Sequence, residues 1–237
     1  MKIKILFAFG LTASLIPLAV SAEETSPWSC DFSLYGLAAG MSGNATVKGV
    51  NANVDVGFDK ILDHLQFGAM GTARIGYDRW ALTTDIIYMK LGASKNAVNV
   101  DLEQWVVEPT LSYRLCKYFE PLVGLRYNNV SGDINGPFGR NPTGTQEWYD
   151  PIIGGNVNLP LSQSFSFNLR GDIGGFGVGS DLTWQAFPNF EWHFSKSASV
   201  QLGYRLLYND YETGSGLNKF KYDILTSGPQ IGFAYHF

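Results

Sequence analysis

The sequence has little charge and few of the side chains that catalytic or metal-binding motifs require. Charged residues make up 16% of its 237 residues, and it contains three histidines and two cysteines. It has no Cys/His metal pattern, phosphate loop or dinucleotide motif, so it predicts no catalytic residue, no metal site and no cofactor. The net charge is −4 and basic residues do not cluster, which argues against nucleic acid as a partner.

Long apolar runs are also scarce. The one sizeable run, 5–20, is shorter than the about 20 residues that a membrane-spanning helix needs. Lys2 and Lys4 precede it and small residues end it, which is typical of a secretory signal peptide. We therefore predict a signal peptide at 1–22 and a single domain at 23–237. Such a chain can span a membrane only as a closed barrel.

Strand patterns are abundant. At the end of the chain, Ile231, Phe233, Tyr235 and Phe237 alternate with small or polar residues, which is the period of a strand with one apolar face. Nine earlier segments have strand character, and tight turns alternate with longer polar loops between them, as in outer-membrane barrels. The ten predicted strands are 31–41, 66–77, 80–91, 98–115, 118–134, 146–159, 165–176, 182–194, 198–211 and 220–237. Because 45–56 within the first long loop could itself form a hairpin, eight or twelve strands remain open.

The two faces of these strands differ sharply. One face carries apolar and small residues, with Trp80 and Tyr88, or Trp105 and Tyr113, eight residues apart. Eight residues in a tilted strand span roughly 20 Å, close to the height of an outer-membrane apolar band between its aromatic girdles. We predict an all-β fold, a transmembrane antiparallel up-and-down barrel, with the charges of the other face in the lumen. These charges are Arg74, Asp85, Glu108, Arg114, Glu120, Arg126, Asp150, Arg170, Asp172, Glu191 and Arg205.

The lumen charges allow two interpretations. Five basic and six acidic residues can pair across a narrow interior and fix the strand register, or they can line a small water-filled pore. The sequence favours the paired, structural arrangement. We therefore predict a non-enzymatic barrel with a structural, narrow-pore or surface-interaction role.

The first long loop, 42–65, holds the remaining candidates. Apolar residues recur at helical spacing over 58–65, which predicts a short helix across or just inside the external mouth, with Asp59 as its cap. His64 beside Asp63 is a weak signal for an alternative function, an outer-rim hydrolase, protease or acyltransferase.

Cys30 and Cys116 are expected at the same, periplasmic end of the barrel. They could pair in an oxidising compartment, although Cys30 precedes the first predicted strand, Cys116 lies in the turn before 118–134, and these strands are not neighbours.

Two segments carry a resemblance. The run Asp59-Lys60-Ile61-Leu62-Asp63-His64-Leu65-Gln66-Phe67 and the glycine-rich run 171–185 are similar to segments shared by a set of mostly uncharacterised barrel proteins. The whole chain after the signal peptide resembles small outer-membrane barrel proteins of Gram-negative bacteria, the broad group that includes the membrane domains of OmpA and OmpW. The resemblance implies location in the outer membrane, contact with its lipid and insertion by the barrel-assembly machinery. In that group the insertion signal includes terminal aromatics, here Tyr235 and Phe237. The resemblance brings no catalytic residue.

Overall fold

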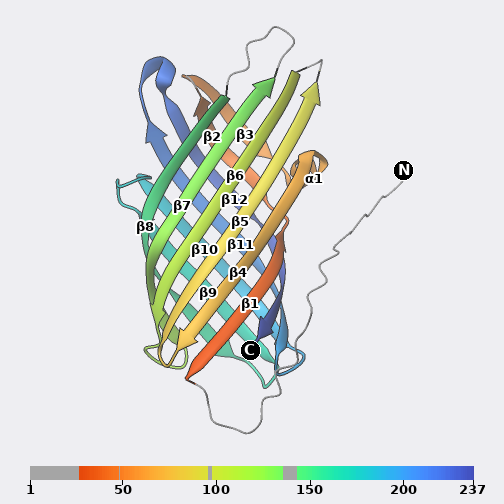
Figure 1. Cartoon of the computed structure of the whole chain (residues 1–237), viewed down its shortest axis with the longest axis vertical. Coiled ribbons are helices and arrows are strands. Elements are labelled where there is room, and N and C mark those ends of the chain that lie inside the picture. The colour runs from red at the N-terminus through yellow and green to blue at the C-terminus, as the bar shows by residue number, and fades with distance from the viewer. Residues whose placement is uncertain (1–26, 48, 96–97, 136–142) are drawn as a thin grey trace, which may run out of the picture.

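A computed structural model of the chain describes residues 27–47, 49–95, 98–135 and 143–237, and these form a closed antiparallel β-barrel (Figure 1). The predicted signal peptide, 1–22, lies outside the described residues. None of the helices among the described residues has the length and hydropathy of a membrane span.

The wall has ten strands, the first two of which are interrupted. β1 (Trp28–Leu37) and β2 (Gly40–Val47) both pair with β12 and together make the first, while β3 (Val50–Val56), the helix α1 (Phe58–His64) and β4 (Leu65–Tyr77) make the second. Every later strand pairs with its sequence neighbours, and the β1–β12 ladder closes the ring. The other strands are β5 (Trp80–Lys95), β6 (Val98–Tyr113), β7 (Phe119–Asn135), β8 (Thr143–Pro160), β9 (Phe165–Gly175), β10 (Leu182–His193), β11 (Ala198–Thr213) and β12 (Phe220–His236).

The predicted ten-stranded, up-and-down barrel is confirmed, but part of the predicted loop 42–65 is strand. Its first half forms the β2–β3 hairpin, whose ladder runs from Met41↔Val56 to Val47↔Val50. The hairpin adds no wall strand, because β2 continues the pairing of β1 along β12. Polar hairpins can extend a barrel beyond the bilayer since the ladder satisfies their backbone in water as well as in lipid. Likewise β5 runs on to Lys95 and so takes up most of the predicted loop 92–97.

The predicted helix over 58–65 is confirmed as α1, whereas its cap and its place are different. Gly57 is the N-cap residue and no side chain caps the helix, because Asp59 lies inside the first turn. α1 lies in the wall rather than across the mouth (Figure 1) and contacts β2 and β5. It fills the place where the β4–β5 ladder ends at Leu65↔Leu91, and its one buried residue is Ile61.

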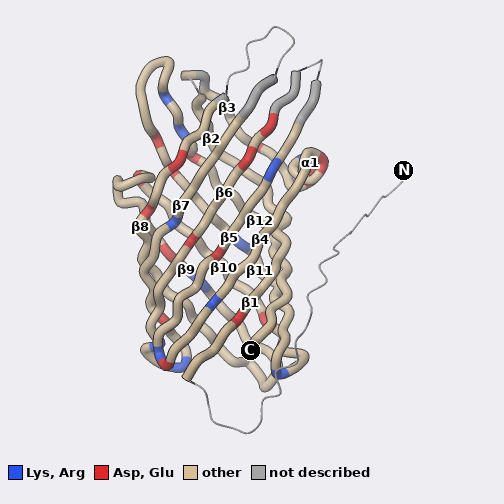
Figure 2. The backbone as a smooth tube through the Cα atoms, viewed as in Figure 1, with Lys and Arg blue, Asp and Glu red and all other residues tan. Residues whose placement is uncertain are grey.

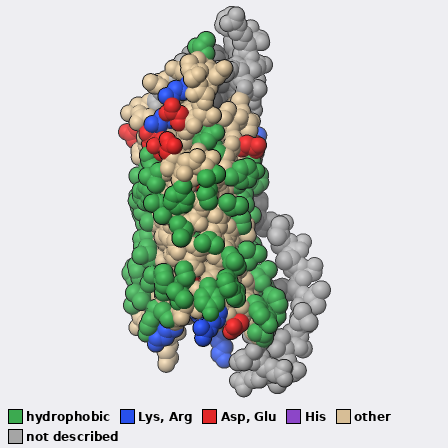
Figure 3. Space-filling model, turned by 90° about the vertical axis from the view of Figure 1, so that its left-hand side faces the viewer, with side chains coloured by type: hydrophobic (Ala, Val, Ile, Leu, Met, Phe, Trp, Pro, Cys, Tyr) green, Lys and Arg blue, Asp and Glu red, His purple; other side chains and the backbone are tan. Residues whose placement is uncertain are grey.

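The outer face of the wall is apolar across its middle. Charged residues occur all along the strands in Figure 2, yet the middle of the face seen in Figure 3 is covered by hydrophobic side chains, so the charges point inward. The aromatic pairs Trp80–Tyr113 and Tyr88–Trp105 lie opposite each other across β5 and β6, with ring centroids 4.8 and 4.3 Å apart. They mark two girdles separated by about 20 Å, which matches the apolar part of a bilayer.

The end with short turns holds both the start of β1 and the end of β12, and in barrels of this kind that end faces the periplasm.

Candidate functional site

At the centre of the lumen two arginines and two carboxylates form a neutral cluster. Arg126 donates from Nε to Glu108 and from Nη2 to Asp172, both at 2.7 Å. Arg170 bonds the same two carboxylates at 2.6 and 3.3 Å. The side chain of Arg126 is 0% exposed and those of its two partners are at most 1% exposed. Each carboxylate therefore bridges both guanidinium groups, and the four residues tie β6, β7 and β9 together across the interior.

Beside this cluster lies a second buried pair. Arg205 of β11 donates to Asp85 of β5 at 2.7 Å, and the guanidinium stands 5.0 Å from the ring centroids of Tyr35 and Phe187. Tyr35 also donates its hydroxyl hydrogen to Asp85, at 2.6 Å. Sequence reasoning missed Tyr35, although its position in the first predicted strand has the inward parity.

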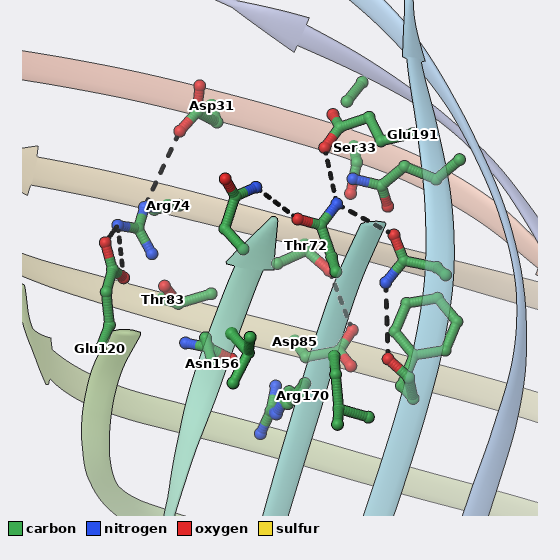
Figure 4. Close-up of a pocket in the computed structure, with 18 of the residues that line it drawn as sticks. Asp31, Ser33, Thr72, Arg74, Thr83, Asp85, Glu120, Asn156, Arg170 and Glu191 are labelled. Atoms are coloured by element: carbon green, nitrogen blue, oxygen red, sulfur yellow. Dashed lines mark hydrogen bonds and ion pairs between the residues drawn. The ribbon is translucent and has the colours of Figure 1, made fainter. Parts of the chain in front are cut away.

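Towards the periplasm the lumen widens into a cavity of about 590 Å³, which we call the vestibule. Arg74 stands between Glu120, at 2.9 Å, and Asp31, at 3.9 Å (Figure 4). Glu120 also accepts a hydrogen bond from Arg114, whose side chain is 50% exposed. The vestibule wall includes Lys117 of the periplasmic turn and Arg170 of the central cluster, so the cavity runs from the turn up to the buried charges.

On the external side of the cluster, Asp150 is held without a basic partner among the described residues. Its carboxylate accepts hydrogen bonds from the backbone N–H and the hydroxyl of Ser180, at 2.6 and 2.9 Å, and from Trp148 Nε1 at 3.1 Å. Gly179 packs so closely that an added Cβ would lie 2.5 Å from the Tyr149 carbonyl oxygen. The glycine-rich turn that joins β9 to β10 is thus held against β8 by these hydrogen bonds and by close packing.

An apolar layer completes the filling of the lumen above the charges. Trp148, Tyr222 and Ile224 pack together with 3, 7 and 1% of their surface exposed, and Trp148 stacks on Tyr211 with centroids 4.3 Å apart. Beneath α1, Ile61 enters a second group of inward apolar residues. This group includes Ala39, Met41, Met70, Ile87, Met89, Val106 and Leu207.

At the periplasmic rim, Glu191 and two histidines come together. His236 has Nδ1 2.7 Å from Asp31 Oδ1 and Nε2 3.0 Å from Ser199 Oγ, the connectivity of a Ser-His-Asp triad. Ser199, however, is fully buried and lies 2.6 Å from Glu191 Oε1, so its hydroxyl hydrogen is committed to that carboxylate. Sequence reasoning could not join these residues, because they come from four separate strands, β1, β10, β11 and β12.

The enzyme candidate predicted from the sequence is His64, and its surroundings differ from those of His236. His64 is exposed at the end of α1, and its Nδ1 lies 2.7 Å from the carbonyl oxygen of Lys60 in the same helix. The two cysteines, Cys30 and Cys116, are both free and exposed.

Outside the membrane, β11 and β12 carry a charged strip. Glu212 pairs with Lys219 at 2.7 Å, and the hydrogen bond from this lysine lowers the pKa of Glu212. Burial raises the pKa of Asp210, although Lys221, 3.7 Å away, acts in the opposite direction.

Comparison with known proteins finds remote likeness only. No family model and no curated sequence matches the chain. Solved structures similar to it include Ail of Yersinia pestis (10% identity, 90% of this chain and 99% of that one, TM-score 0.41) and the translocator domain of the autotransporter NalP of Neisseria meningitidis (13%, 89% and 89%, 0.40). A FadL homologue of Pseudomonas aeruginosa matches at 8% identity over 89% and 90%, with a TM-score of 0.38. The closed wall, apolar belt and paired girdles carry the assignment instead: the chain is an integral β-barrel of the outer membrane.

Proposed function

We propose that the protein is a sealed, non-enzymatic outer-membrane barrel whose charge-paired lumen holds the wall rigid. One observation carries this proposal. Side chains facing inward from strands all around the ring are buried at the level of the central cluster, among them Asp85, Glu108, Arg126, Asp172 and Arg205. A water-filled channel would leave such charges exposed, whereas these are buried in ion pairs with one another.

The apolar layer supports the same conclusion. A pore needs a continuous polar path, and the packing of Trp148 against Tyr211 and Tyr222 interrupts it on the external side. The vestibule is then a recess that opens only to the periplasm. The central ion-paired cluster and the apolar layer close it on the external side.

The enzymatic alternative has less support at either end. His64 at the external side is bonded to its own helix, and Ser199 at the periplasmic rim is fully buried and bonded to Glu191. Neither offers a nucleophile that a substrate can reach. Hydrolysis or acyl transfer that is lost in His64→Ala, with folding intact, would restore the outer-rim enzyme.

Several strands extend beyond the external aromatic girdle and form a surface outside the membrane. The β2–β3 hairpin and the ends of β11 and β12 rise above it with polar outer faces. We infer a surface-interaction role for this extension. The other inferred partners are outer-membrane lipid around the belt and, during insertion, the assembly machinery reading Tyr235 and Phe237, which are exposed.

Planar-bilayer recording of the refolded chain lacking residues 1–22 tests the seal. We expect no discrete conductance steps from protein shown to be folded by heat-modifiable gel mobility and far-UV circular dichroism. An unrelated open porin in the same membranes serves as the positive control. Reproducible steps from the folded barrel would overturn the sealed lumen and make the charge pairs a selectivity filter.

A further inference from the structure

Three potential metal ligands meet at the periplasmic rim of the lumen. Glu191 and His193 end β10, and His236 ends β12. One ligand atom from each of the three lies within 4.8 Å of the others. Nε2 of His193 is 3.9 Å from Glu191 Oε2, and Nε2 of His236 is 3.8 Å from Glu191 Oε1. Each imidazole thus faces a different oxygen of the same carboxylate.

Neighbouring groups orient two of these ligands. Asp31 lies 2.7 Å from Nδ1 of His236, so a proton held on that nitrogen leaves the lone pair on Nε2, which now lies 3.0 Å from Ser199 Oγ and can turn to a metal ion. A carboxylate that fixes a histidine in this way is the usual second layer of a protein zinc site. Asn168 and Ser199 donate to the two oxygens of Glu191 at 3.0 and 2.6 Å, which holds the carboxylate in place.

We propose that Glu191, His193 and His236 bind a divalent late first-row metal ion, with Zn²⁺ the first choice. Two imidazoles and one carboxylate are a donor set that suits Zn²⁺ rather than Ca²⁺ or Mg²⁺. Tetrahedral ligands at about 2.0–2.1 Å from zinc lie roughly 3.3 Å apart, so the three groups need to close by about 1.5 Å at most. The imidazoles can make this movement, because the side chains of His193 and His236 are 38 and 26% exposed.

The position of the site predicts an effect on the barrel. β10 and β12 flank β11, and a metal ion held by both strands would cross-link the end of the wall beside the closing β1–β12 ladder. The ion would bind the folded barrel and not the unfolded chain, so stability should rise with the logarithm of the metal concentration once that concentration exceeds Kd. His236 and Glu191 line the vestibule, so a water molecule in that cavity could serve as the fourth ligand of the ion.

Calorimetric titration of Zn²⁺ into untagged, chelator-treated, refolded barrel tests the site, with both cysteines changed to serine to remove thiol binding. We expect one ion per barrel, and at least tenfold weaker binding in Glu191→Gln and in His193→Gln. Asp31→Asn should weaken binding about 10–100-fold through His236 alone. His64→Gln is the matched control, because this third histidine lies on α1 and should leave the titration unchanged.

Two further readouts keep the outcome clear. Co²⁺ should give the visible absorption of a tetrahedral site, lost in Glu191→Gln, and Zn²⁺ should shift the urea midpoint of the parent but not of that variant. Gel mobility shows which variants fold. Absence of binding to the folded parent, or binding that Glu191→Gln and His193→Gln leave intact, would overturn the site.

Discussion

Removing Arg126 should destabilise the barrel far more than removing an arginine of the vestibule. Arg126→Met keeps most of the side-chain volume but leaves Glu108 and Asp172 to share Arg170, so the buried cluster changes from neutral to a net charge of −1. Breaking a buried ion pair from one side costs about 3–5 kcal/mol. At about 1.4 kcal/mol per factor of ten, the folding equilibrium constant should fall by roughly 10² to 10⁴. Arg114→Met, whose side chain is 50% exposed, should cost about 1 kcal/mol or less.

Reversible urea unfolding in lipid vesicles, followed by tryptophan fluorescence, measures both costs. The double variant Arg126→Met/Asp172→Asn restores neutrality, since Arg170 and Glu108 remain paired at 2.6 Å. We therefore expect the two changes to be less than additive, with a coupling of about 1–3 kcal/mol. A loss for Arg126→Met as small as that for Arg114→Met, or strict additivity in the double variant, would mean that the cluster is hydrated and would remove the main support for a sealed lumen.

Two further predictions concern the external side. Gly179→Ala should cost about 1–3 kcal/mol in the same unfolding assay, because the new Cβ would lie 2.5 Å from the Tyr149 carbonyl oxygen. The control Gly36→Ala, where nothing lies within 4 Å of the new Cβ, should be neutral or slightly stabilising. Equal effects of the two changes would refute the tight packing of the β9–β10 turn against β8. The pKa of Glu212 is lowered from its ordinary 4.5 by the hydrogen bond from Lys219, so the contribution of this pair is complete above pH 4.5 and is lost as the pH falls through the lowered pKa. An NMR titration should show the pKa of Glu212 rising towards 4.5 in Lys219→Ala, and an unchanged titration would contradict the pairing.

The sequence contains enough information to define the wall. A strand in a barrel has one face towards lipid and one towards the lumen, so inward charges and outward aromatics must alternate with period two. The eight-residue spacing from Trp80 to Tyr88 corresponds to the height of the apolar band between the two girdles. The boundaries of the external loops are harder to predict. Polar residues above the membrane suit both a loop and a solvated hairpin, and only the continued ladder along β12 makes 42–56 a strand pair.

Parity shows which side chains enter the lumen, but it does not show which of them meet. Arg205 and Asp85 are 120 positions apart, and Arg170 and Glu108 are 62 apart. Whether two inward residues on distant strands reach the same height depends on the shear of the closed barrel, and a one-residue slip in any ladder would change the pairing.

The three proposed metal ligands at the periplasmic rim, Glu191, His193 and His236, are also brought together by the closed ring. His193 and Glu191 are two residues apart on one strand, yet they gain His236 only because the β11 ladder brings the last residue of β12 to the same level. A sequence search for closely spaced ligands cannot see this arrangement, whereas closure of the ring produces it without any local motif. In a barrel, therefore, strand ends that share one parity and one rim are the place to look for sites that the linear sequence conceals.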